Sequence, residues 1–331
     1  MSRLNYGTAL LSGFRWLMRN HPEVFVIGQG LWSPWYVGNS MTDLDKEFGR
    51  ERVIDSPVSE SSITGVAVGA ALSGKKPIIV HPRMDFMLYS MDAIVNQAAK
   101  WRHMMGGGAS VPLTIRAIVN RGGEQGAQHS QALHSWFAHI PGLRVVMPAS
   151  VSDARDLLIA SVLSQDPVVF IDDRWLYSQE CEVGPVDKPL NLNEEGPKVI
   201  RKGKDITLIA SSYSVVLAKK AADKLSKFDV DAEVIDVRVL SPLKTTVILQ
   251  SVKKTGRALC VDGGWATCGF SSEILALLAE GLNPSVWKAA PKRLTLPFAP
   301  APSSSALEAE YYPDDDDVVE IVMKIFDKNS R

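Results

Sequence analysis

The chain has 331 residues, a formal net charge of −1 and 46% hydrophobic residues. This length allows two domains with large cores, and the near-neutral charge gives no electrostatic reason to expect a nucleic acid or an anionic membrane as a partner. No apolar run reaches the ~18 residues of a membrane-spanning helix, and the N-terminal residues lack the apolar core of a secretory signal. We therefore expect a cytoplasmic enzyme or enzyme subunit.

Predicted strands and helices alternate along the first half of the chain. The strands are predicted at residues 23–28, 52–55, 77–80, 112–119, 143–147 and 167–171, and the helices at about 10–17, 61–73, 86–105 and 152–164. Near-continuous apolar strands that alternate with helices are typical of a mostly parallel sheet covered on both faces. The sequence therefore predicts an α/β domain.

A second, smaller α/β domain is predicted in the remainder of the chain. Its strands are expected at residues 205–210, 232–237 and 258–261, and a helix at 215–228. Between the two domains, residues 185–198 contain prolines and an acidic pair and show no periodicity, which indicates a linker. The predicted organisation is thus a domain at 1–184, a linker at 185–198 and a domain at 199–331.

A single acid, Glu60, precedes a run of small and apolar residues that is predicted to be helical. A buried carboxylate must be satisfied, because an isolated charge in a dry site is costly. No acid or base follows for many residues, so its partner is not a sequence neighbour; a cofactor nitrogen would serve, and the helix dipole is the alternative. Gly65, Gly69 and Ala70 remove bulk from one side of the helix, which predicts a closely packed partner helix.

The loop at residues 120–131 is rich in glycine and follows a predicted strand. Ligands of parallel α/β sheets bind where such loops leave the carboxyl ends of the strands. His129 is the residue of this loop that can transfer a proton near neutral pH, and a structural histidine is the alternative.

Motifs that cradle phosphates are missing from the sequence. Residues 28–30 begin like a dinucleotide-binding turn, but Ser33 stands where the third glycine is expected. The chain also lacks the Gly-Asp-Gly triplet, followed by Asn, that holds magnesium and a diphosphate. If a diphosphate cofactor is used, another chain must hold that end.

Five segments together resemble one protein family. They are residues 58–71, 90–100, 127–131, 141–148 and 262–265. In this order they resemble the beta subunit of thiamine diphosphate-dependent 2-oxoacid dehydrogenases, a group that includes pyruvate, branched-chain and acetoin dehydrogenases. The resemblance implies a transketolase-like pyrimidine-binding domain followed by a smaller transketolase C-terminal domain.

The resemblance also implies roles for particular residues. Glu60 matches the glutamate that hydrogen-bonds the aminopyrimidine of the cofactor and shares a proton with it. Phe86 matches the aromatic residue that lies against the same ring, and Gln29 and Ile63 stand at further cofactor-binding positions. His129 matches the active-site histidine that binds the substrate carboxylate or handles protons.

Partners and metals follow from the same resemblance. An alpha subunit would hold the magnesium-bound diphosphate, two alpha and two beta subunits would form the enzyme, and a lipoyl acyltransferase core would accept the product. Some family members bind potassium through backbone carbonyls. The matching positions are Leu113, Ser161, Val162, Ser164 and Asp166.

Two departures from the family bear on the substrate. The family usually has an acid where this chain has Gln29, and Arg83 introduces a permanent cation just before Phe86. We hypothesise that Arg83 contacts an anionic group of a substrate larger than pyruvate, and an ion pair at a subunit interface is the alternative. The leading interpretation is decarboxylation of a 2-oxoacid with transfer to lipoamide. The alternatives are a split transketolase-like enzyme that acts on sugars or a specialised metabolite, and a non-catalytic assembly subunit.

Overall fold

The computed structural model describes residues 2–327, which pack as two compact units. The first unit takes in the chain up to residue 121 together with 128–195, and the second takes in 122–127 and the chain from 196 onward. The predicted linker, 185–198, is irregular until a strand begins at Lys198. No helix in the described part of the chain is both long and apolar enough to cross a membrane.

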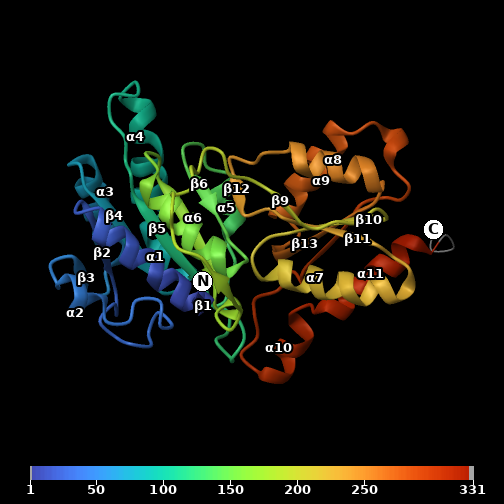
Figure 1. Cartoon of the computed structure of the whole chain (residues 1–331), viewed down its shortest axis with the longest axis horizontal. Helices are drawn as coiled ribbons and strands as arrows, with labels where there is room; N and C mark the ends of the chain where they lie inside the picture. The colour runs from blue at the N-terminus through green and yellow to red at the C-terminus, as the bar shows by residue number, and fades with distance from the viewer. Residues whose placement is uncertain (1, 328–331) are drawn as a thin grey trace. The chain divides into compact units, whose positions relative to one another are not determined.

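The first unit contains the predicted alternation of strands and helices (Figure 1). Its elements are β1 (Ser2–Asn5), α1 (Tyr6–Asn20), β2 (Val24–Gly28), α2 (Leu44–Phe48), β3 (Val53–Asp55), α3 (Glu60–Leu72), β4 (Lys76–His81), η1 (Met84–Ser90), η2 (Asp92–Ala98), α4 (Ala99–Met104), β5 (Thr114–Val119), α5 (His134–Ala138), β6 (Arg144–Val146), α6 (Val151–Leu163), β7 (Val168–Asp173), η3 (Arg174–Leu176) and β8 (Glu180–Val183). The predicted strands correspond to β2 through β7.

These six strands form a parallel sheet in the order β6-β7-β5-β4-β2-β3. Every residue of β5 and β7 is buried, as expected for central strands of a parallel sheet with both faces covered. Helix α1 packs against α6, and α3 packs against β4 and η1. The predicted mostly parallel α/β domain is therefore confirmed.

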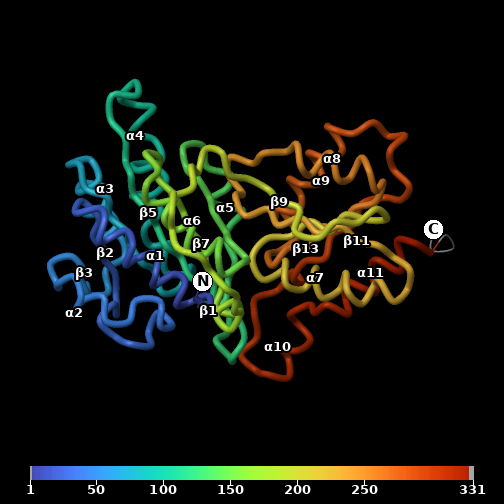
Figure 2. The backbone as a smooth tube through the Cα atoms, in the orientation of Figure 1, coloured from blue at the N-terminus to red at the C-terminus, as the bar shows by residue number. Residues whose placement is uncertain are grey.

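The segment predicted as one α-helix over residues 86–105 is helical but changes type twice. It begins earlier, as the 3₁₀ helix η1, continues as the π-helix η2 and ends as the α-helix α4. Long-range side-chain bonds hold its first part, from Asp85 to Gln131 and from Ser90 to Glu60. Helix α4 and the glycines after it project from the unit (Figure 2).

The second unit is the smaller α/β domain that the sequence predicts. Its elements are β9 (Lys198–Arg201), β10 (Ile206–Ala210), α7 (Tyr213–Leu225), η4 (Ser226–Phe228), β11 (Ala232–Asp236), β12 (Val239–Ser241), α8 (Thr246–Thr255), β13 (Ala258–Trp265), α9 (Phe270–Gly281), η5 (Pro284–Val286), β14 (Lys292–Leu296), α10 (Ser305–Tyr311) and α11 (Asp315–Phe326). Its sheet has the order β14-β13-β10-β11-β9, and only β9 runs antiparallel to its neighbour. Helices α7 and α11 lie together on one side of this sheet, and α8 and α9 on the other (Figure 1).

Candidate functional site

The residues singled out in the sequence gather around η1, which follows the carboxyl end of β4. In parallel α/β sheets this is the edge where ligands bind. Phe86 lies within η1, Arg83 immediately precedes it, and α3, which begins at Glu60, packs against it. The fold therefore brings these three positions, from two separate stretches of the chain, to one edge of the sheet.

Two hydroxyl groups hold the backbone of Glu60. The hydroxyls of Thr64 and Ser90 lie 2.7 and 2.8 Å from the Glu60 carbonyl oxygen and donate to it, and the Thr64 hydroxyl shares its single proton with Ser90 Oγ, which is 2.8 Å away. Buried His81 lies behind them, with Nε2 3.5 Å from the Thr64 hydroxyl, and burial lowers the pKa of His81 to about 4. The first turn of α3 is thus tied to the end of η1.

The carboxylate of Glu60 is held less tightly than its backbone. The side chain is half-buried, and none of residues 2–327 forms a hydrogen bond or an ion pair with this carboxylate. A carboxylate accepts hydrogen bonds readily when it is ionised. Glu60 is therefore able to accept a hydrogen bond from a ligand that donates one.

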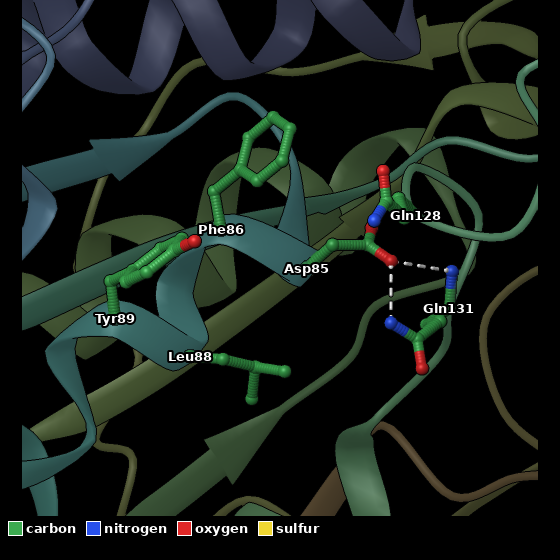
Figure 3. Close-up of a pocket in the computed structure, with 6 residues that line it drawn as sticks. All are labelled: Asp85, Phe86, Leu88, Tyr89, Gln128 and Gln131. Atoms are coloured by element: carbon green, nitrogen blue, oxygen red, sulfur yellow. Dashed lines mark hydrogen bonds between the residues drawn. The ribbon is translucent and has the colours of Figure 1, made fainter.

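His129 lies beside Phe86. The two rings meet edge to face, with centroids 5.3 Å apart and planes at 84°. A pocket of about 360 Å³ adjoins them and is lined by Asp85, Phe86, Leu88, Tyr89, Gln128 and Gln131. In Figure 3 the side chains of Asp85 and Gln131 point toward each other, whereas Phe86 points away from them. This side of η1 therefore offers apolar surface next to a histidine and a buried acid.

Arg83 and Gln29 both lie near Tyr36. Gln29 Nε2 donates to the Tyr36 hydroxyl at 2.8 Å, and Arg174 Nη2 donates to the Tyr36 carbonyl oxygen at 2.9 Å. Arg83 is half-buried and donates to the Pro82 carbonyl oxygen at 2.8 Å. Burial, and secondly the positive charge of Arg174, lower the pKa of Arg83. Two guanidinium groups thus raise the electrostatic potential on this side of the site.

The five positions matched to a potassium site fall in two places. Leu113 precedes β5, and the other four lie at the end of α6 and in the loop before β7. The Leu113 carbonyl oxygen accepts from the Val168 amide at 2.9 Å, and the Ser161 carbonyl oxygen accepts from the Ser164 amide at 3.2 Å. The Asp166 carboxylate binds Arg102 at 2.5 Å and Arg144 at 2.9 Å. The Asp166 carboxylate is therefore already neutralised by two arginines.

The donor set fits one end of thiamine diphosphate better than the other. The unpartnered carboxylate of Glu60 suits the hydrogen-bonding edge of an aminopyrimidine, and Phe86 offers an aromatic surface on the adjacent η1. Within residues 2–327 no group of three or more His, Cys, Asp or Glu side chains is arranged to hold a metal ion. The donor set of Glu60 and Phe86 therefore fits the pyrimidine end of the cofactor.

Three further residues of the site escaped the sequence analysis: Thr64, Ser90 and Asp85. The two hydroxyls were indistinguishable from ordinary helix residues, because their common partner is the backbone of residue 60. Asp85 had a usable signal, since an acid that follows a buried strand stands where ligand sites form. Ile63 is buried on α3.

Comparisons with known proteins identify the class and then the family. Residues 2–179 match the pyrimidine-binding domain of transketolase, and residues 197–318 match the transketolase C-terminal domain. The chain therefore has the two-domain arrangement of transketolase-like enzymes. More narrowly, it belongs to the family of beta subunits of thiamine diphosphate-dependent 2-oxoacid and acetoin dehydrogenases, as the resemblance in sequence implied.

Two relatives illustrate the family. The chain is 35% identical to the beta subunit of acetoin:2,6-dichlorophenolindophenol oxidoreductase from Bacillus subtilis, with 97% of each chain covered. It is also 35% identical to the mitochondrial pyruvate dehydrogenase E1 component subunit beta of Drosophila melanogaster, covering 91% of this chain and 80% of the relative. A solved structure described as a split-gene transketolase, an inactive beta4 tetramer, matches with a TM-score of 0.76 and 22% identity over 97% of this chain and 96% of that one. This last likeness concerns the fold.

Proposed function

We propose that the chain is the beta subunit of a thiamine diphosphate-dependent enzyme that decarboxylates a 2-oxoacid and passes the acyl unit to lipoamide. An alpha-type subunit would hold the magnesium-bound diphosphate, and two such subunits with two copies of this chain would form the heterotetramer. The observation that carries the proposal is the carboxylate of Glu60, whose backbone is tied down while none of the described residues binds its oxygens. Potassium at the five carbonyl positions, and docking to a lipoyl acyltransferase core, belong to the same proposal.

Each residue would have a distinct task in this reaction. Bound thiamine diphosphate supplies a carbon nucleophile for the substrate carbonyl and an electron sink for decarboxylation. Glu60 would hold a proton at a pyrimidine ring nitrogen, in a charge-assisted hydrogen bond worth about 1.5–3 kcal/mol. Phe86 would pack against the same ring. His129 would bind the substrate carboxylate or transfer a proton at the substrate oxygen.

Arg83 would extend the substrate class beyond pyruvate. Burial, and secondly the charge of Arg174, lower the pKa of its half-buried guanidinium, so an anion bound there would relieve repulsion between the two cations. A 2-oxoacid with a second carboxylate fits this environment. A phosphate group fits it as well, and that outcome would favour the split transketolase-like alternative.

The test of the substrate class compares Arg83→Ala and Arg83→Lys in the assembled enzyme. We expect the alanine variant to lose kcat/KM for substrates with a second anionic group by about 10- to 100-fold, since a charge-assisted bond is worth 1.5–3 kcal/mol, and to keep it for pyruvate. The lysine variant should recover part of the loss. An unchanged ranking of dicarboxylic 2-oxoacids, sugar phosphates and pyruvate would remove the role of Arg83.

The test of the reaction uses Glu60→Gln after co-expression with an alpha-type subunit. Glutamine keeps the size of the side chain but cannot hold the proton, and we expect activity to fall at least about 100-fold, as is common for acid–base groups. Glu273→Gln is the matched control, because Glu273 is exposed in the first turn of α9. Full activity of Glu60→Gln would instead support a non-catalytic assembly subunit.

A further inference from the structure

Two adjacent side chains at the start of η1 hold the segment that follows His129. Asp85 Oδ1 accepts hydrogen bonds from the backbone amide of Gln131 at 3.2 Å and from its side-chain Nε2 at 2.9 Å (Figure 3). The neighbouring sulfur, Met84 Sδ, accepts from the Leu133 amide at 3.4 Å. Residues 131–133 are thus fastened at two points to η1.

This fastening lies next to the contact between Phe86 and His129. Phe86 directly follows Asp85, and His129 lies two residues before Gln131. Both rings are therefore only one or two peptide units from the same hydrogen-bonded tie. A shift of Gln131 relative to η1 would change how the two rings, now 5.3 Å apart, face the pocket.

Asp85 is an unusual residue to use as a simple structural anchor. It is 6% exposed, and its second oxygen, Oδ2, is buried with no hydrogen-bond partner in the described chain. Burial raises the pKa of Asp85, while the hydrogen bonds from Gln131 and the nearby His129 oppose that rise. The negative charge of Asp85 in turn partly offsets the lowering of the pKa of Arg83. A buried carboxylate oxygen without a donor is costly to the folded state, and such a cost is common where a side chain serves a functional site.

We propose that Asp85 is a positioning residue, which sets His129 against Phe86 at the pocket by holding Gln131. Its effect on turnover rests on the function proposed above, whereas its effect on the placement of the His129 ring does not. The proposal assigns Asp85 no contact with substrate. It predicts that Asp85 acts through His129 alone.

A double-mutant comparison in the assembled enzyme tests that dependence. We expect Asp85→Ala to lower kcat/KM about 10- to 100-fold, which is the scale of loss when a reacting group is misplaced by about 1 Å. The same change made in a His129→Ala background should cost less than about 2-fold, because residues that act as one unit are not additive. Asp85→Asn keeps an acceptor for Gln131 and should recover part of the loss. Equal losses in both backgrounds would overturn the proposal.

A second readout needs no activity. In the full-length chain the NMR signals of the His129 ring, assigned by their loss in His129→Ala, carry a ring-current shift from Phe86, and Phe86→Leu defines its size. We expect Asp85→Ala to move these signals at least halfway toward their positions in Phe86→Leu. Asp205→Ala is the control, because Asp205 Oδ2 likewise accepts a backbone amide, that of Asp231 at 2.9 Å, in the other unit; it should leave the signals in place.

The outcomes separate this proposal from the proposed function. Signals that stay at their wild-type positions in Asp85→Ala would overturn the positioning role. If Asp85→Ala does not fold, Gln131→Met removes only the Nε2 bond and should move the signals in the same direction by a smaller amount. If Asp85→Ala displaces the signals while the wild-type assembly turns over no 2-oxoacid, the positioning role of Asp85 is supported and the proposed reaction is rejected.

Discussion

Ser90 offers a direct test of how the backbone of Glu60 is held. Its hydroxyl donates to the Glu60 carbonyl oxygen at 2.8 Å and accepts from the Thr64 hydroxyl at 2.8 Å. Ser90→Ala removes both bonds from a site where Ser90 is completely buried. Each such bond contributes about 0.5–1.5 kcal/mol, so we expect the first turn of α3 to lose about 1–3 kcal/mol.

Ser73→Ala is the matched control for this change. The Ser73 hydroxyl also donates to a carbonyl oxygen of α3, that of Gly69 at 2.9 Å, but it is exposed to solvent. Water replaces a lost bond at the surface, and substitutions there usually change stability by less than about 0.5 kcal/mol. The two variants therefore remove the same chemical group from the same helix in different surroundings.

Hydrogen exchange measures the effect where it should occur. The Ile63 amide donates to the Ser59 carbonyl oxygen at 3.0 Å and reports opening of the first turn of α3. A loss of 1–3 kcal/mol corresponds to about 5- to 150-fold faster exchange at this amide in Ser90→Ala. Equal acceleration in Ser73→Ala, or no acceleration in Ser90→Ala, would refute the role of the two hydroxyls.

Three further predictions concern stability. Arg116→Met should lower the free energy of unfolding, measured in urea, by about 3–5 kcal/mol, because it leaves fully buried Asp172 without its guanidinium partner at 2.8 Å; a loss below about 1 kcal/mol would contradict this. Burial lowers the pKa of His81 to about 4, so neutral His81 stabilises the folded state above the unfolded pKa of about 6.5, and this stabilisation is lost as the pH falls toward 4. In His81→Gln the melting temperature should therefore depend less steeply on pH between about 6.5 and 4. An unchanged dependence would argue against this role of His81. Gly142→Ala should lower the melting temperature more than Gly107→Ala. Both glycines have positive φ, but an added Cβ would lie 1.9 Å from a carbonyl oxygen at Gly142, while at Gly107 no described atom lies within 4 Å. Equal shifts would show that the backbone strain of a positive φ decides the effect and the steric clash does not.

The strands of the parallel sheet in the first unit were predictable because most of their residues are buried, whereas the more exposed strands β1 and β8 were missed. Residues 112–119 are apolar apart from Thr114 and Arg116, and the structure makes Thr114–Val119 the fully buried strand β5. The helix types over residues 84–104 were not predictable, because Ser90 bonds to a residue 30 positions away. Such a bond leaves no mark on local periodicity. The short helix α2 was also missed, since its five residues are too few to show a helical pattern.

The candidate site likewise contains residues that stood out in the sequence and residues that were recognised only from the structure. Glu60 and His129 stood out because a charge before an apolar run, and a histidine in a glycine-rich loop, are unusual in sequence alone. Asp85 was not singled out in the sequence, and in the structure its burial and its hydrogen bond to Gln131, 46 residues away, distinguish it from an exposed loop acid.

Helix α3 carries one more consequence. Gly65 and Gly69 are exposed, and no described atom lies within 4 Å of a Cβ added at either. Glycine inside a helix is less favourable than alanine by about 1 kcal/mol, so alanine at either position should make the lone polypeptide more resistant to heat. A mutational scan that measures only the thermal stability of the single chain would thus rank both glycines as unfavourable. A role of these glycines in subunit packing would show only in a scan that measures the stability or activity of the assembled enzyme.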